Sequence, residues 1–120
     1  MFINKVLYYN EEDSDAEVSV SDGLYTINCY AYPVNNVFVN QQINSIYGFK
    51  CVNITKADKR NYAITKLDQH YAYQITAQVV DNVSGIVRIG EIFVHIDNYI
   101  PKDIINGDYI SFSVLRLDCN

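Results

Sequence analysis

The stretch His70-Tyr-Ala-Tyr-Gln-Ile-Thr-Ala-Gln-Val-Val-Asp81 decides the fold, because apolar and polar side chains alternate along most of its length. Such alternation is typical of a β-strand with one buried face. Turn-forming residues follow at 81–85, and a second β-branched run extends from Ile86 to Ile96, so we expect a β-hairpin. The side chains expected on the buried face of the first strand are Tyr71, Tyr73, Ile75, Ala77 and Val79.

The second run changes its apolar phase at Gly90. Val87 and Ile89 keep one phase before the glycine, whereas Ile92, Val94 and Ile96 keep the other phase after it. A phase change at a glycine is typical of a bulge or a sharp bend, so we expect one there.

Two further segments predict strands. Asp22-Gly23 lies between two alternating runs, 16–20 and 24–32, and Asp-Gly is a strong hairpin signal, which would turn Ile27, Cys29 and Ala31 inward. The last strand is expected over 109–117, with Ile110, Phe112 and Val114 on one face.

The middle of the chain has weaker patterns. We expect short strands at 37–39 and 49–54, with a helical turn between them. Residues 58–69 fit either a helix capped by Asp58 or a strand through Tyr62. The fold class predicted for residues 1–120 is therefore all-β, or β-dominated with one short helix, in a single domain shaped as a small barrel or sandwich.

Composition indicates a globular chain, with 49% hydrophobic and 19% charged residues. Lys5 interrupts the apolar run at the amino terminus and carboxylates follow it, which does not fit a secretory signal. The cysteines Cys29, Cys51 and Cys119 are too few and too widely spaced for a disulfide framework. We therefore expect a cytoplasmic protein with reduced thiols and no membrane association.

Charge is concentrated at the amino terminus. Residues 1–23 contain six acidic residues and only one basic residue, Lys5, which accounts for the whole net charge of −5. A pI near 4.7 disfavours a general nucleic-acid binder, because phosphate affinity comes from clustered Lys and Arg. This distribution predicts a partner with a basic surface.

Residues 90–96, Gly-Glu-Ile-Phe-Val-His-Ile, and the later segment 107–114, Gly-Asp-Tyr-Ile-Ser-Phe-Ser-Val, resemble the second half of a cold-shock-type OB-fold domain. The resemblance covers about 25 of the 120 residues. It implies a barrel, and it would assign nucleic-acid contacts to Phe93 and His95. The strand before Gly90 departs from the family pattern, since it lacks the aromatic residues that stack on bases.

Motifs for catalysis are absent from the sequence. The Cys and His residues lack the short spacings of zinc sites, no glycine-rich phosphate loop is present, and no local nucleophile–base pair stands out. We therefore expect a protein that is not an enzyme and that needs no metal or other cofactor.

The expected activity is protein binding. Tyrosines beside carboxylates suit an interface for a basic protein, because aromatic side chains supply buried area and complementary charge speeds encounter. An acidic inhibitor or immunity-type protein would fit this description. The candidate residues are Tyr8, Tyr9, Glu11, Glu12, Asp13, Asp15, Tyr30 and Tyr32.

Two alternatives remain open from the sequence. One is an OB-type nucleic-acid-binding protein, in which basic and aromatic residues would form a patch. The residues of that patch would be Lys56, Lys59, Arg60, Tyr62, Lys66, Phe93 and His95. The other is a structural or oligomeric subunit that associates through unpaired strand edges.

Overall fold

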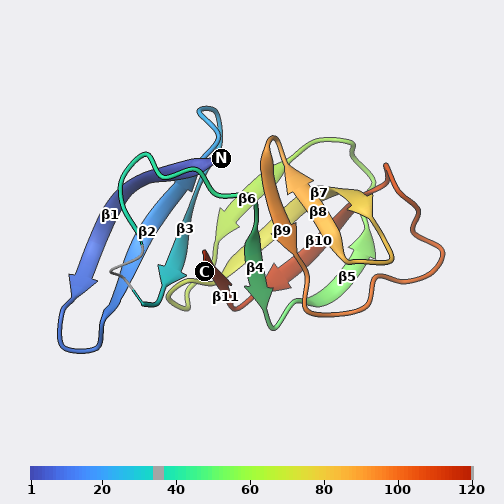
Figure 1. The fold of residues 1–120 in the computed structure, drawn as a ribbon. Coiled ribbons are helices and arrows are strands. Elements are labelled where there is room, and N and C mark those ends of the chain that lie inside the picture. The colour runs from blue at the N-terminus through green and yellow to red at the C-terminus, as the bar shows by residue number, and fades with distance from the viewer. Residues whose placement is uncertain (34–36, 120) are drawn as a thin grey trace.

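The computed structural model describes residues 1–33 and 37–119, and it contains eleven strands and no helix in these ranges. All the strands belong to one mixed sheet (Figure 1). They are β1 (Phe2–Asn10), β2 (Asp15–Ser21), β3 (Thr26–Ala31), β4 (Ile46–Phe49), β5 (Val52–Lys56), β6 (Ala63–Lys66), β7 (Tyr73–Asp81), β8 (Ile86–Ile89), β9 (Ile92–His95), β10 (Tyr109–Val114) and β11 (Arg116–Asp118).

The strand order is β1-β2-β3-β11-β4-β9-β8-β7-β10-β5, and β6 pairs with β7 off this path. In Figure 1 strands β1 to β3 stand apart on the left, and we call them the wing; strands β4 to β10 form the body. The molecule is elongated, with extents of 45 × 25 × 23 Å.

The predicted all-β class is confirmed, but the predicted barrel is wrong. Along the described chain, the end strands β1 and β5 do not pair, so the sheet is not closed. A sandwich of two separate sheets is not formed either, because β11 joins wing and body by pairing with β3 on one side and β4 on the other. Buried apolar side chains from wing and body nevertheless form one core cluster.

Strand β7 is the centre of the body. It pairs with β10 along one edge, while β6 and β8 share its other edge. The predicted inward residues of β7 are buried, as are the three predicted inward residues of β10. Tyr71 is the exception, because it lies before the strand with φ +71° and is half-buried.

Of the bulge or sharp bend predicted at Gly90, the structure has the sharp bend, and the chain reverses completely there. Residues 86–96 form two short strands, β8 and β9, in which Ile89 pairs with Ile92 across the turn residues Gly90 and Glu91. Gly90 has φ +59°, which suits the first turn position of a two-residue hairpin. Reversal at this point explains the phase change, because both halves turn their apolar residues to the same core.

Residues 49–54 also depart from the prediction of one strand. Lys50 has φ +56° and separates β4 from β5. The Asp97 carboxylate holds this bend by accepting the backbone N–H groups of Lys50 at 2.7 Å and Cys51 at 2.8 Å. These bonds outweigh the effect of burial, which would raise the pKa of Asp97, and the net effect is a lowered pKa.

Three other expectations for the middle of the chain are corrected or decided. Residues 37–39 form no strand, and no helical turn is described between 40 and 48. The segment 58–69 contains strand β6 rather than a helix. The segment is a strand and not a helix because β6 pairs with β7. The sequence pattern within residues 58–69 cannot predict a contact with another strand.

The Asp22-Gly23 hairpin is confirmed, and Ile27, Cys29 and Ala31 point into the core. Asp22 also links wing to body, because its Oδ2 accepts the backbone N–H of Glu91 at 2.8 Å. The three cysteines are buried, and burial raises the pKa of Cys51 to about 12 and that of Cys119 to about 11.

Candidate functional site

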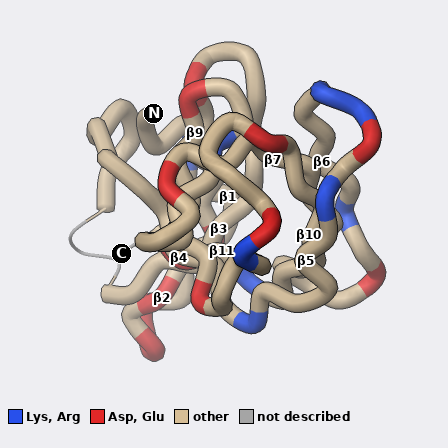
Figure 2. Tube along the Cα trace, turned by 90° about the vertical axis from the view of Figure 1, so that its right-hand side faces the viewer, with Lys and Arg blue, Asp and Glu red and all other residues tan. Residues whose placement is uncertain are grey.

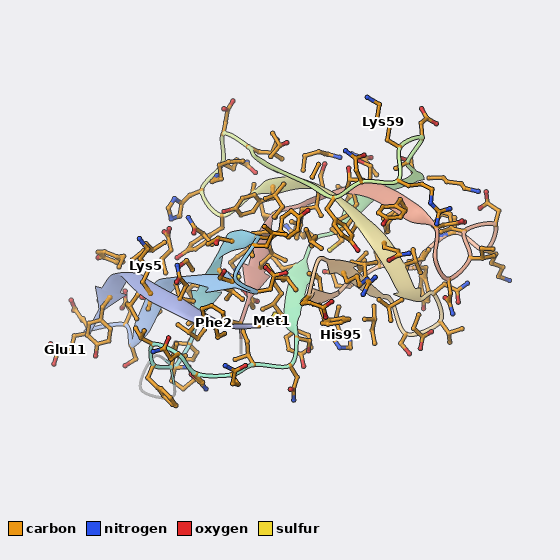
Figure 3. All side chains as sticks on the ribbon, turned by 90° about the horizontal axis from the view of Figure 1, so that it is seen from above. Met1, Phe2, Lys5, Glu11, Lys59 and His95 are labelled. Atoms are coloured by element: carbon orange, nitrogen blue, oxygen red, sulfur yellow. The ribbon has the colours of Figure 1, made fainter. Side chains whose placement is uncertain are left out.

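The connection between β1 and β2 is a tight acidic turn, Glu11 to Ser14, which we call the acidic tip. Asn10 holds it: its Nδ2 donates to Asp13 Oδ2 at 3.0 Å, and its Oδ1 accepts the Asp13 backbone N–H at 3.2 Å. Ser14 has φ +57° and completes the reversal. Figure 3 places Glu11 at one extreme of the molecule, far from Lys59. The tip therefore projects its carboxylates away from the body.

The outer half of β1, residues 4–10, presents apolar side chains beside this tip. Val6, Leu7, Tyr8 and Tyr9 are 38%, 43%, 61% and 52% exposed. Ile3 is still covered, since its N–H donates to Gln41 O at 2.9 Å and its carbonyl accepts Asn40 N–H at 2.8 Å. Beyond Ile3, β2 is the one described strand that pairs with β1, so the opposite edge is open.

Strand addition to this open edge is hindered. The register with β2 slips between Ile3 and Lys5 and again between Val6 and Tyr8, and Lys5 carries a charge at the same edge. Bulges and charged side chains are common devices that protect edges from pairing. The edge is therefore better suited to contacts through side chains than to backbone pairing.

A row of side chains crosses the sheet from this edge. Tyr8 pairs with Glu17, Glu17 with Tyr30, and Tyr30 with Asp118 in successive strands. Paired residues project to the same face, so these side chains lie side by side. The row continues through Tyr47 to His95, whose rings stack at 5.1 Å.

Arg116 fixes the centre of the row. Its guanidinium lies 4.5 Å from the centre of the Tyr30 ring and 5.2 Å from that of Phe49. The same group donates to both oxygens of Asp118, at 2.6 and 3.1 Å, which raises the pKa of Arg116. Tyr30 donates its hydroxyl to Asp15 at 3.2 Å, and burial together with the Asp15 charge raises the pKa of Tyr30.

The loop between β6 and β7 covers the wing end of the row. His70 Nε2 lies 2.7 Å from Glu17 Oε1, and the Tyr71 ring packs edge-on against both His70 and Tyr30. Burial, followed by the charges of Glu17 and Asp15, raises the pKa of Tyr71 to about 12. This network ties wing to body and uses the carboxylates of Asp15 and Glu17 internally.

The eight predicted partner-binding residues thus lie in three different settings. Tyr8, Tyr9, Glu11, Glu12 and Asp13 lie together at the outer end of the wing and are exposed. Tyr30, a member of the row, donates to Asp15, and Tyr32 is 56% exposed just after β3.

Sequence reasoning missed Glu17, His70, Tyr71 and Arg116. Arg116-Leu-Asp118 carried a signal, because residues two apart on a strand share a face and opposite charges there form a pair. The partners of Glu17 and Tyr71 come from distant segments, so no local signal marks them.

No cation in the described ranges forms an ion pair with the acidic tip. The ion pairs among the described residues are Lys56–Asp108, His70–Glu17, Arg88–Glu91 and Arg116–Asp118. None of them includes Glu11, Glu12 or Asp13. The tip therefore keeps three exposed carboxylates next to an exposed apolar strand.

The predicted basic patch is only partly assembled. Arg60 lies 5.5 Å from the centre of the Tyr109 ring, which also packs against Tyr62 at 5.5 Å. Lys56 is paired with Asp108 at 3.6 Å, and the Lys66 ammonium donates to the carbonyls of Leu67 and Gln69. Figure 2 shows the basic segments beside β5, β6 and β10, whereas the acidic tip lies near β2.

Phe93 and His95 belong to two different rows of paired side chains and do not lie together. Register places Phe93 beside Arg88, Gln78 and Tyr109, on the face that also carries Tyr62. His95 belongs to the row of Tyr47 and Arg116, and Figure 3 shows it far from Lys59. Lys59 is exposed in the loop before β6.

No group of three His, Cys, Asp or Glu side chains in the described ranges could hold a metal ion. The same residues include no helix of the length and apolarity needed to cross a bilayer. No protein-family model, curated protein or solved structure matches this chain.

Proposed function

We propose that the outer half of β1 and the acidic tip bind a protein partner with a basic surface, and that the chain acts by binding rather than by catalysis. One observation carries this proposal: Val6, Leu7, Tyr8 and Tyr9 are all exposed at the open edge of β1, with Tyr8 on the face of Glu17 and Val6 and Tyr9 on the face of Val18 and Ala16. The acidic tip follows directly after Asn10, and none of the ion pairs among the described residues includes its three carboxylates. Exposed apolar patches rimmed by charge are typical of protein interaction sites. An inhibitor or immunity-type role, in which the tip masks a basic active site, fits this geometry.

The two parts of the surface have different roles in this proposal. The side chains of Leu7, Tyr8 and Tyr9 supply the area that becomes buried, because aromatic and aliphatic anchors dominate interface energies. The carboxylates steer a basic partner and set the salt dependence of the association rate. The Arg116 network beneath them holds the wing in a fixed orientation on the body.

The test compares two triple variants as baits in a pull-down from the native host at low and high salt. E11Q/E12Q/D13N removes the tip charges, and D58N/D68N/D103N removes three exposed charges from loops of the body. We expect wild type and the body variant to retain the same basic protein, and the tip variant to bind it about tenfold more weakly. Equal retention by all three baits would contradict the proposal.

A nucleic-acid-binding role is the second candidate, favoured by the Arg60, Tyr62 and Tyr109 cluster. Guanidinium groups bind phosphates and tyrosine rings stack on bases, so these groups suit a single strand. Fluorescence anisotropy with a labelled oligonucleotide at low salt tests it, and R60Q together with K59Q should flatten the dependence of affinity on salt. An oligonucleotide that does not bind at low salt would remove this candidate.

A further inference from the structure

A depression of about 390 Å³ lies on the body between β5, the end of β10 and the loop that joins β6 to β7. Its walls are mainly apolar, and two of them are large side chains left partly in solvent, Val52 at 44% and Leu67 at 38% exposed. The volume falls in the lower part of the range of small-molecule sites, which starts near about 300 Å³. The apolar lining residues are Val52, Leu67, Ala72, Val114 and Leu115.

Hydrogen bonds and strand pairing fix both walls. On one side, the Lys66 ammonium donates to Leu67 O at 2.7 Å and Gln69 O at 2.6 Å, and Ala72 N–H donates to Gln69 O at 3.1 Å. On the other side, Val52 pairs with Ser113, and Leu115 N–H donates to Phe49 O at 3.1 Å. A ligand would therefore meet a preformed surface.

One of the polar residues that line the depression, Lys50, carries a positive charge. Lys50 is the ionisable side chain among the described residues that line the depression, and the other polar side chains are Gln69 and Ser113. None of the ion pairs in the described ranges includes Lys50, whose Nζ lies 5.6 Å from the centre of the Phe49 ring. The nearby Asp97 carboxylate is bonded to two backbone N–H groups.

We propose that this depression binds a small amphipathic carboxylate, with the apolar body against Val52, Leu67 and Leu115 and the carboxylate at Lys50. An apolar depression lined by one cation that takes part in none of the ion pairs among the described residues complements a ligand that has one anionic head and an aliphatic body. The site does not rest on the proposed function, because it shares no residue with the acidic tip or the outer half of β1.

Octanoate is the probe, and octan-1-ol is its uncharged counterpart. Both are titrated into the isotopically labelled full chain at constant ionic strength, and amide chemical shifts are followed by NMR. We expect saturable shifts at Val52, Leu67, Ala72 and Leu115, with octanoate binding about tenfold more tightly than octanol.

Two variants separate the charge from the apolar wall. K50Q should reduce octanoate binding to the level of octanol, and L67N should weaken both ligands, whereas K102Q, in the loop after β9, should leave both unchanged. The spectra themselves report whether each variant is folded. Absence of saturable shifts at the lining residues, equal affinity of wild type for the two ligands, or full octanoate affinity in K50Q would overturn the proposal.

Discussion

Strands β1 and β7 have the same length, nine residues each, yet one is largely exposed and the other is the centre of the core. Their apolar content does not explain the contrast. In β7 apolar and polar residues alternate, so one face can be buried completely. In β1 the apolar residues Val6 to Tyr9 are consecutive, and residues 4–9 are all exposed at an edge that pairs on one side.

The comparison shows that the phase of the apolar residues and the number of neighbouring strands decide burial. A consecutive apolar run in an edge strand must leave some of its side chains in solvent. Because its exposed apolar residues are consecutive and lie beside the acidic tip, this run is the natural place to look for a partner surface.

The largest expected difference between the two regions is in stability. Phe112 pairs across from β7 and is completely buried, so F112A should lower the free energy of unfolding by about 3–5 kcal/mol. L7A, which truncates a residue that is 43% exposed, should cost less than about 1 kcal/mol. Urea unfolding followed by circular dichroism measures both. Similar losses would mean that the outer half of β1 belongs to the stabilising core.

The junction between wing and body gives a smaller effect. A Cβ on Gly90 would lie 2.5 Å from Asp22 Oδ2 and 2.8 Å from the Tyr25 ring, whereas a Cβ on Gly23 meets nothing within 4 Å. Both glycines have positive φ, so G23A should show the backbone cost alone, about 1 kcal/mol. G90A should cost roughly 1–2 kcal/mol more, because the wing must shift. Thermal unfolding compares the two variants, and equal losses would show that the junction is loose.

Asp22 gives the smallest effect, and it depends on pH. Burial raises its pKa, but hydrogen bonds from the N–H groups of Glu91, Tyr25 and Leu24 outweigh burial, so the folded pKa is lowered. A depressed carboxylate stabilises the fold above the unfolded pKa of about 3.9, and this stabilisation is lost as pH falls through the folded pKa.

Replacing this charge should therefore matter at neutral pH and not in acid. D22N should cost about 1 kcal/mol near pH 7, and the difference from wild type should shrink below about pH 3. Urea unfolding at both pH values measures it, with D68N in an exposed loop as the charge-matched control. A cost that does not change with pH would assign the effect to packing instead of charge.

Local sequence patterns were sufficient for some strands and for most of their inward residues, but the strand predicted at 37–39 is absent and those predicted at 49–54 and 86–96 are interrupted. Alternation located β7 and β10, and Asp22-Gly23 located the wing hairpin, because these signals depend on neighbours in the chain. They were insufficient for the sheet as a whole. The parallel pairings of β4 with β9 and of β3 with β11 join distant segments, so the predicted barrel was replaced by an open sheet.

Part of the candidate surface could also be predicted from residues that are neighbours in the sequence. Consecutive tyrosines and acids drew attention to Tyr8, Tyr9 and the acids of the tip, which are contiguous in sequence, but strand β1 and its exposed Val6 and Leu7 were not predicted. The sequence did not distinguish Glu11, which is exposed and unpaired, from Asp15, which is bonded to Tyr30. That distinction depends on Arg116 and Tyr71, which come from β11 and the loop before β7 and hold Tyr30 in place.

The most direct test of the partner surface is site-specific photo-cross-linking in host extract. A photoreactive amino acid replaces Leu7 in one sample and Val83, a 93% exposed residue in a body loop, in the other. We predict one discrete basic protein cross-linked at position 7, lost at high salt and in the E11Q/E12Q/D13N background. The same products from both positions, or a position-7 product indifferent to salt and to the tip charges, would contradict the account.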